Sequence, residues 1–222
     1  FINKIFKVKN DFIMSSITGL EGLKPTLNSI KFTKNILIAN KEAIICGWYL
    51  IQKELLKHKT NFIPVDSEHF SIWYSLKKNN IQNIDKIYLT ASGGPLLNIS
   101  KKKFNSLKIK DVIKHPNWSM GKKISVDSST MMNKVFEIIE AKNMFNVGYN
   151  NLYILLHPKS YVHAIIQFKG GMTKIVAHPT TMEIPIFNSL YDDESKKIKT
   201  INLDIAKLND LNLTIINNKK FP

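Results

Sequence analysis

Two acidic residues come directly after a predicted strand at residues 62–65. Asp66 and Glu68 are separated by one serine, and His69 follows them. Open α/β sheets place ligand-binding loops at the carboxyl ends of their strands, and Mg²⁺ and Mn²⁺ prefer oxygen ligands. The pair could therefore bind a divalent cation if the backbone bends between the two residues. Alternatively, Asp66 could cap a helix that carries Glu68 in its first turn.

A second set of polar residues recurs at helical spacing in residues 128–145, a segment expected to form one long helix. Apolar residues cover most of its circumference, which predicts a buried helix. The polar residues share the remaining face, and they are Thr130, Asn133, Lys134, Glu137 and Glu140. Such a stripe could bind phosphate and metal together in a polar cavity. It could equally be a solvated face with a Lys134–Glu137 ion pair.

Two loops add groups that suit an anionic ligand. Residues 115–121 combine His115, Trp118 and Gly121, so this loop could close over a substrate and exclude water. The alternative is a tryptophan packed under a surface loop. Ser92 precedes two glycines in a turn whose amides and hydroxyl could hold a phosphate, although a plain turn has the same composition. Together these signals indicate one site for an anion and a metal.

Composition limits the classes of protein to be considered. The 222 residues are 44% hydrophobic and 22% charged, which is typical of a folded protein with a sizeable core. All 32 basic residues are lysines, and arginine, the preferred side chain for reading guanine, is absent. The net charge of +15 therefore indicates no nucleic-acid partner, although it favours anionic small substrates. No membrane-spanning run is predicted, and the single cysteine fits a reducing compartment.

The elements that must position these residues alternate between strands and helices in the first half of the chain. This alternation predicts a parallel, doubly wound sheet. Strands are expected at residues 11–16, 35–39, 62–65 and 86–90, with helices at 19–31, 41–58 and 68–77. A weak helix after residue 100 precedes the loop and the long helix, and strands follow at 152–156, 161–168 and 172–177. The last two should form a hairpin around two glycines. Residues 192–222 are lysine- and asparagine-rich and are interpreted as a linker.

Five motifs in this order resemble those of a known family. They are residues 39–42, 64–69, 91–95, 115–121 and 124–134, and His157, Pro158 and His163 continue the match. The chain strongly resembles the 1-deoxy-D-xylulose 5-phosphate reductoisomerases up to about residue 190. The resemblance implies an NADPH-dependent enzyme that converts 1-deoxy-D-xylulose 5-phosphate to 2-C-methyl-D-erythritol 4-phosphate in non-mevalonate isoprenoid biosynthesis. It also implies a partial dinucleotide-binding (Rossmann-like) parallel sheet followed by an α+β catalytic domain.

The resemblance assigns roles to individual residues. Asp66, Glu68 and Glu137 would bind one Mg²⁺ or Mn²⁺. Lys41, Glu68, Glu137 and His115 would be catalytic. The substrate phosphate would be held by Ser92, Ser128, Asn133 and Lys134, while Lys41, Ser67 and His115 contact the rest of the phosphosugar. Trp118 would act as the lid, and the NADPH contacts would be Asn40, Glu42, Met120, Gly121, Ile124 and Met182.

The chain also departs from the family pattern. No glycine-rich phosphate-binding turn precedes Phe1, and the chain ends where the family has a linker toward a helical domain. We therefore expect a fragment that binds substrate with little turnover. Its expected parts are the second half of an NADPH-binding domain (1–65), a catalytic domain (66–191) and a linker (192–222). Lys159 replaces a usual glutamine, and Thr181 stands where aspartate usually precedes the methionine.

Other functions remain open from the residues alone. A metal-dependent phosphosugar isomerase or aldolase would use the same groups without nicotinamide, and an inactive basic binding fragment would use none of them. We expect no membrane partner, and we expect a homodimer when the protein is full length. The expected location is the bacterial cytoplasm or a plastid-type organelle.

Overall fold

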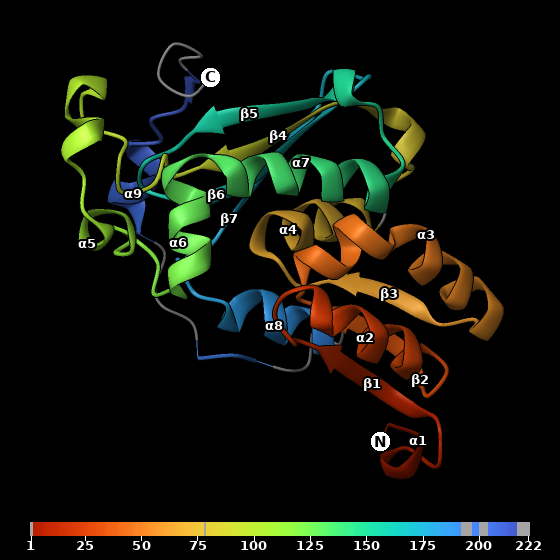
Figure 1. The fold of residues 1–222 in the computed structure, drawn as a ribbon. Helices are drawn as coiled ribbons and strands as arrows, with labels where there is room; N and C mark the ends of the chain where they lie inside the picture. Colours follow the sequence, from red (N-terminus) through yellow and green to blue (C-terminus); the bar gives the residue numbers. More distant parts are fainter. Residues whose placement is uncertain (1, 78, 192–196, 200–203, 217–222) are drawn as a thin grey trace.

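A three-stranded parallel sheet forms the first part of the structure. The computed structural model describes residues 2–77, 79–191, 197–199 and 204–216. The first sheet has the order β1 (Asn10–Ser15), β2 (Thr33–Ile38), β3 (Asn61–Pro64), and its strands are joined by α2 (Leu23–Ile30) and α3 (Lys41–His58). Both helices pack on the same face of this sheet (Figure 1), around Ile36, Ile38 and Ile44. This arrangement confirms the predicted Rossmann-like parallel sheet.

A five-stranded mixed sheet forms the second part. Its order is β7 (Thr173–Ala177), β6 (Val162–Phe168), β4 (Ile84–Ala91), β5 (Leu152–Leu156), β8 (Thr214–Ile215). Only β4 and β5 run parallel, and the expected β6–β7 hairpin is present. The helices α4 (Ser67–Leu76) and α7 (Met132–Phe145) cover one face of this sheet (Figure 1), where Ile72, Ala141 and Phe145 pack against its strands.

The remaining elements are short. They are α1 (Ile2–Ile5), η1 (Leu20–Gly22), η2 (Ile81–Asn83), η3 (Lys101–Ser106), α5 (Ile109–Val112), α6 (Lys122–Ser129), η4 (Tyr149–Asn151), α8 (Glu183–Leu190) and α9 (Ile205–Asn209). Helix α8 returns to the first sheet, because Ile186 and Leu190 pack against Leu37 and Ile63. None of the helices in the described part of the chain has both the length and the hydropathy needed to cross a membrane.

The start of α3 and the start of α4 place candidate residues by local capping. Asn40 caps α3 by accepting a hydrogen bond of 2.7 Å from the Ala43 amide, so Lys41 begins the helix. Asp66 caps α4 by accepting from the Glu68 amide at 3.3 Å. The capping interpretation of Asp66 is therefore correct, and it leaves the second carboxylate oxygen of Asp66 outside the cap.

Three expectations about the elements are wrong. The helix predicted at 128–145 begins only at Met132, as α7, because residues up to Ser129 belong to the separate helix α6 and Met131 between them has a left-handed backbone with a φ of 63°. The strand predicted at 86–90 belongs to the second sheet and not to the first. The supposed linker contains α9 and β8, and β8 pairs antiparallel with β5. Residues 192–196, 200–203 and 217–222 of that segment lie outside the described residues.

Candidate active site

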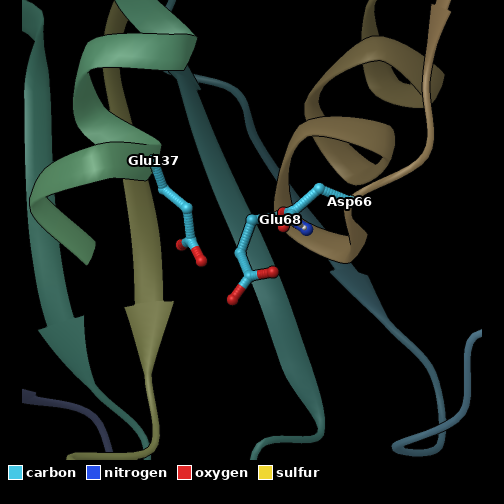
Figure 2. A group of neighbouring side chains, drawn as sticks. All are labelled: Asp66, Glu68 and Glu137. Carbon is cyan, nitrogen blue, oxygen red and sulfur yellow. Dashed lines mark hydrogen bonds between the residues drawn. The ribbon is translucent and has the colours of Figure 1, made fainter. Parts of the chain in front are cut away.

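Three carboxylates from two separate elements meet beside the second sheet. Asp66 and Glu68 lie at the junction of β3 and α4, and Glu137 projects from α7 (Figure 2). One carboxylate oxygen from each residue lies within 4.8 Å of the other two. Glu137 is 1% exposed, and the other two are half-buried. The structure therefore brings together the three residues that the sequence placed around a cation.

Two buried lysines lie among these carboxylates. Lys134 Nζ lies 2.7 Å from Glu68 Oε1 and also pairs with Glu137 Oε2. Lys41 Nζ lies 3.5 Å from Glu137 Oε1 and 3.6 Å from Asp66 Oδ2. Burial alone would lower the pKa of Lys134, but Glu137 and Glu68 outweigh it and raise that pKa above its usual value. Both alternatives for the stripe are thus partly correct: the Lys134–Glu137 pair exists, but it is buried inside a polar cluster.

The carboxylates differ in how easily they take up a proton. Burial opposes ionisation of Asp66, but Lys41 and His69 together hold the pKa of its carboxyl well below the usual range. Burial and the neighbouring Glu68 raise the pKa of Glu137. Asp66 is therefore the firmly ionised member, while Glu137 depends on nearby positive charge to remain ionised.

His69 connects the two elements that supply the carboxylates. Its ring is fully buried; Nδ1 lies 3.3 Å from Asp66 Oδ1 and Nε2 lies 2.9 Å from the backbone carbonyl of Glu137. A carbonyl can only accept, so Nε2 carries a hydrogen and donates to it. Although burial opposes protonation, Glu140 and Asp66 raise the pKa of His69 to about 9. A protonated His69 can then bond to both residues at once.

The donor set fits a hard divalent cation. All three convergent side chains offer carboxylate oxygens, the ligand type that Mg²⁺ and Mn²⁺ prefer, and among the described residues the group contains no cysteine sulfur or histidine nitrogen. The cluster also carries positive charge on Lys41 and Lys134, which stabilises buried carboxylates in the absence of a cation.

A second part of the site is built from hydroxyl groups and amides. His115 Nδ1 accepts hydrogen bonds from the Asn117 and Trp118 amides, at 3.1 and 3.0 Å. Burial lowers the pKa of His115, so its ring is neutral and its hydrogen is on Nε2, which donates to Ser92 Oγ at 2.8 Å. Because the Gly94 amide also donates to Ser92 Oγ, the serine hydrogen is free to donate to an anion.

A cavity of about 300 Å³ joins the carboxylates to these hydroxyl groups. Every site residue predicted from the sequence borders it except Lys41, Asn40 and Glu42. Lys41 lies behind the carboxylates and donates to Asn133 Oδ1 at 2.5 Å. The Asn40 side-chain amide donates a hydrogen bond of 2.7 Å to the Gly19 carbonyl, and Glu42 forms an ion pair with Lys123 at 2.6 Å. Lys159 does not border the cavity either and pairs with Asp210.

Sequence reasoning missed several residues that border the cavity, among them Ser160 and His163. The His163 ring stacks on His178 with ring centroids 3.7 Å apart, and Trp118 packs edge-on against His163 at 5.9 Å. Burial and the neighbouring His178 lower the pKa of His163 to about 4. His163 was part of the family match but received no role, although a histidine inside an otherwise apolar strand was an available signal, whereas Ser160, two residues after Pro158, gave none.

Gly94 provides a test of how closely the turn at residues 92–95 approaches α6. Its φ is +63°, and a Cβ at this position would lie 2.5 Å from the Ser128 carbonyl oxygen. We expect Gly94→Ala to lower the free energy of unfolding by about 2 kcal/mol, through strain and this clash. The matched control is Gly170→Ala, where a Cβ meets nothing within 4 Å. Equal urea denaturation midpoints for the two variants would show that the turn tolerates a side chain.

Comparisons with known proteins show which family the chain resembles. Residues 2–47 match the family model of 1-deoxy-D-xylulose 5-phosphate reductoisomerase, and residues 62–145 match the model of the C-terminal domain of the same enzyme. A curated reductoisomerase from Pelagibacter ubique is 61% identical over the whole chain, which covers 58% of that relative. One from Clostridium acetobutylicum is 43% identical over 83% of the chain and 48% of the relative. The chain thus spans about half the length of these relatives.

Solved structures show the same likeness. A reductoisomerase in complex with NADPH, fosmidomycin and magnesium superposes with a TM-score of 0.90 at 33% identity, over 99% of this chain and 56% of the other. The Zymomonas mobilis enzyme in complex with NADPH gives a TM-score of 0.89 at 31% identity, over 100% of this chain and 57% of the other. With both family models, these relatives and these folds in agreement, the chain belongs to the 1-deoxy-D-xylulose 5-phosphate reductoisomerase family.

Proposed function

We propose that the cavity is the substrate and metal site of an NADPH-dependent reductoisomerase that converts 1-deoxy-D-xylulose 5-phosphate to 2-C-methyl-D-erythritol 4-phosphate. The single observation that carries this proposal is the convergence of Asp66, Glu68 and Glu137 in a cavity that Ser92 and Ser128 also line. A phosphosugar has an anionic end and a polar carbon chain, and one cavity that holds both hydroxyl groups and a carboxylate cluster suits both parts. The family relationship supports the same reaction.

The phosphate end is proposed to orient the substrate. Ser92 donates its hydroxyl hydrogen because His115 and the Gly94 amide occupy its acceptor positions. Ser128, Asn133 and Lys134 border the same cavity and complete the proposed anion site. Binding energy gained at a remote phosphate can fix the reacting carbons in place without entering the chemical step itself.

The carboxylate end is proposed to bind Mg²⁺ or Mn²⁺ through Asp66, Glu68 and Glu137. When bound, such a cation polarises a substrate carbonyl and stabilises negative charge on its oxygen. Lys41 keeps Asp66 ionised, and His69 fixes the relative position of Asp66 and the Glu137 backbone. Trp118 and His163 line the cavity beside this cluster and reduce the access of water to it.

The nicotinamide side is proposed to lie against Met120, Gly121, Ile124 and Met182, all of which border the cavity. The other two proposed NADPH contacts lie near the start of α3. Asn40 is 3% exposed and is occupied with backbone groups, so its proposed role is to shape the loop at residues 17–19. Glu42 is accessible at the surface beside α6.

The proposal includes a homodimer with a specific surface. The face of the second sheet opposite α4 and α7 carries a cross-strand row of apolar side chains, set by the register of β5, β4, β6 and β7: Tyr153, Tyr88, Ile165 and Ile175. Tyr153 and Ile175 are 41% and 52% exposed. A second copy of the chain would cover this row. The bacterial origin of the relatives named above supports a bacterial setting.

The test is NADPH oxidation in the presence of 1-deoxy-D-xylulose 5-phosphate and Mn²⁺ by the protein that carries this sequence, followed as loss of nicotinamide absorbance. We expect oxidation that requires both the substrate and the metal. Conversion of the phosphosugar without loss of that absorbance would instead support an isomerase or aldolase. Binding of DNA with steep salt dependence and no Mn²⁺ binding would support the basic binding fragment.

A further inference from the structure

We propose that Asn117 is a positioning residue that clamps residues 115–121 to the turn at residues 158–160 and turns the Ser160 hydroxyl into a hydrogen-bond donor to the cavity. The part that concerns the ligand rests on the function proposed above. The clamp itself rests only on contacts within the chain. No other residue of the loop contacts this turn through a hydrogen bond that the described residues show.

The Asn117 side chain makes two contacts with the turn. Its Nδ2 atom donates to the Pro158 carbonyl oxygen and, at 3.0 Å, to Ser160 Oγ. A carbonyl oxygen can only accept, so the atom facing Pro158 must be the amide nitrogen and the orientation of this side chain is fixed by chemistry. Both hydrogens of the amide group are used on a turn 41 to 43 residues away in sequence.

The orientation of the amide determines what Ser160 can do. Ser160 Oγ accepts a hydrogen from Asn117, which leaves the single hydrogen of the hydroxyl free to donate elsewhere. Ser160 borders the cavity and is 7% exposed. Its backbone has a φ of 51°, an unfavourable conformation for serine that the surrounding contacts must hold. Asn117 provides two of those contacts.

The same loop acts on the other serine of the cavity. His115 Nε2 donates to Ser92 Oγ, just as Asn117 Nδ2 donates to Ser160 Oγ. The Asn117 amide in turn donates to His115 Nδ1 at 3.1 Å, which keeps the histidine hydrogen on Nε2. One loop therefore sets two serine hydroxyls as donors, and Asn117 contributes to both arrangements.

The clamp is tested first without any ligand, by amide hydrogen exchange with mass spectrometry on the 222-residue chain. We expect Asn117→Asp and Asn117→Ala to accelerate exchange in peptides covering residues 113–121 by about tenfold or more, because neither side chain can donate to the Pro158 carbonyl and alanine also loses the bond to Ser160. Exchange in β4 and β6 should stay unchanged and shows that the variants fold.

The matched control is Asn151→Asp, which removes a similar bond, from Asn151 Nδ2 to the Asp85 carbonyl at 2.7 Å, outside the cavity lining. It should leave exchange at 113–121 as in the wild type. Unchanged exchange at 113–121 in both Asn117 variants would overturn the clamp, whatever the protein binds.

The effect on Ser160 is tested with fosmidomycin as the probe, in the presence of Mn²⁺. We expect Ser160→Ala and Asn117→Asp each to weaken its affinity by about tenfold. The double variant should lose less affinity than the sum of the two single losses, because part of the effect of Asn117 acts through that hydroxyl. Additive losses would overturn the coupling to Ser160. If the wild type fails to bind fosmidomycin, the proposed function fails, and the exchange experiment still decides the clamp.

Discussion

A Glu137→Gln variant should have an affinity for Mn²⁺ at least about 100-fold lower than that of the wild-type chain. Losing even a residue that only hydrogen-bonds to a metal ligand lowers metal affinity by about 10- to 100-fold. The amide of glutamine occupies the same space as the carboxylate but carries no charge. Asp66 and Glu68 would remain, yet two carboxylates that face two buried lysines attract a divalent cation far less than three do. Calorimetric titration with Mn²⁺ measures the difference.

In the protein that carries this sequence, the same change should abolish NADPH oxidation in the proposed reaction. Glu183→Gln is the matched control, since Glu183 is an exposed glutamate at the start of α8 and does not border the cavity. It should leave Mn²⁺ affinity unchanged. If Glu137→Gln binds Mn²⁺ within about threefold of the wild type, Glu137 is not a metal ligand.

Acidification should weaken Mn²⁺ binding to the wild-type chain. Burial and Glu68 raise the pKa of Glu137, so a proton competes with the cation at this carboxylate before it competes at Asp66, whose pKa is lowered. Binding requires the deprotonated form, and affinity therefore falls as pH falls toward the raised pKa of Glu137. In Glu137→Gln this source of pH dependence is absent.

The elements with strong local signals were predictable from the sequence. The helix expected at 41–58 is α3 with the same bounds, because an asparagine cap precedes it and a left-handed residue, Lys59, follows it. The strands at 62–65 and 152–156 are also found within one residue. Their apolar runs are short, bounded by polar residues and buried in the sheets, so local pattern and tertiary packing agree.

The errors arise where tertiary contacts decide the conformation. Nothing in the sequence around Met131 distinguishes a break from a continuing helix, yet its left-handed backbone separates α6 from α7. The orientation of α7 is also instructive: Val135 and Met132 are 46% and 44% exposed, whereas Lys134 and Glu137 are buried. A periodicity shows that two faces differ, but it does not show which face is covered when polar groups neutralise one another.

Charge balance inside the cluster leads to the second large effect. Lys134→Met should lower the free energy of unfolding of the metal-free chain by about 3–5 kcal/mol, the usual cost of removing one partner of a buried ion pair. Lys134 is 4% exposed and lies between Glu68 and Glu137, so its loss leaves Glu68 without this partner and Glu137 with Lys41 as its remaining lysine partner. Urea denaturation followed by circular dichroism gives the difference.

Lys123→Met is the matched control for burial. Lys123 also bridges two carboxylates, Glu42 at 2.6 Å and Asp127 at 2.8 Å, but its side chain is 62% exposed. Exposed pairs contribute less than about 1 kcal/mol, so this variant should be nearly as stable as the wild type. Equal destabilisation by the two lysine changes would show that the buried cluster has no special energetic role.

The cause of the Lys134 effect can be separated from a simple loss of packing. If unpaired negative charge is responsible, adding Glu137→Gln to Lys134→Met should recover part of the lost stability, since one of the two affected carboxylates is removed. Mn²⁺ should also raise the denaturation midpoint of Lys134→Met more than that of the wild type, because the cation no longer competes with a lysine for the same oxygens. A loss that neither the second substitution nor Mn²⁺ reduces would assign the effect to packing, and Lys134 would then not be the counter-charge of the carboxylates.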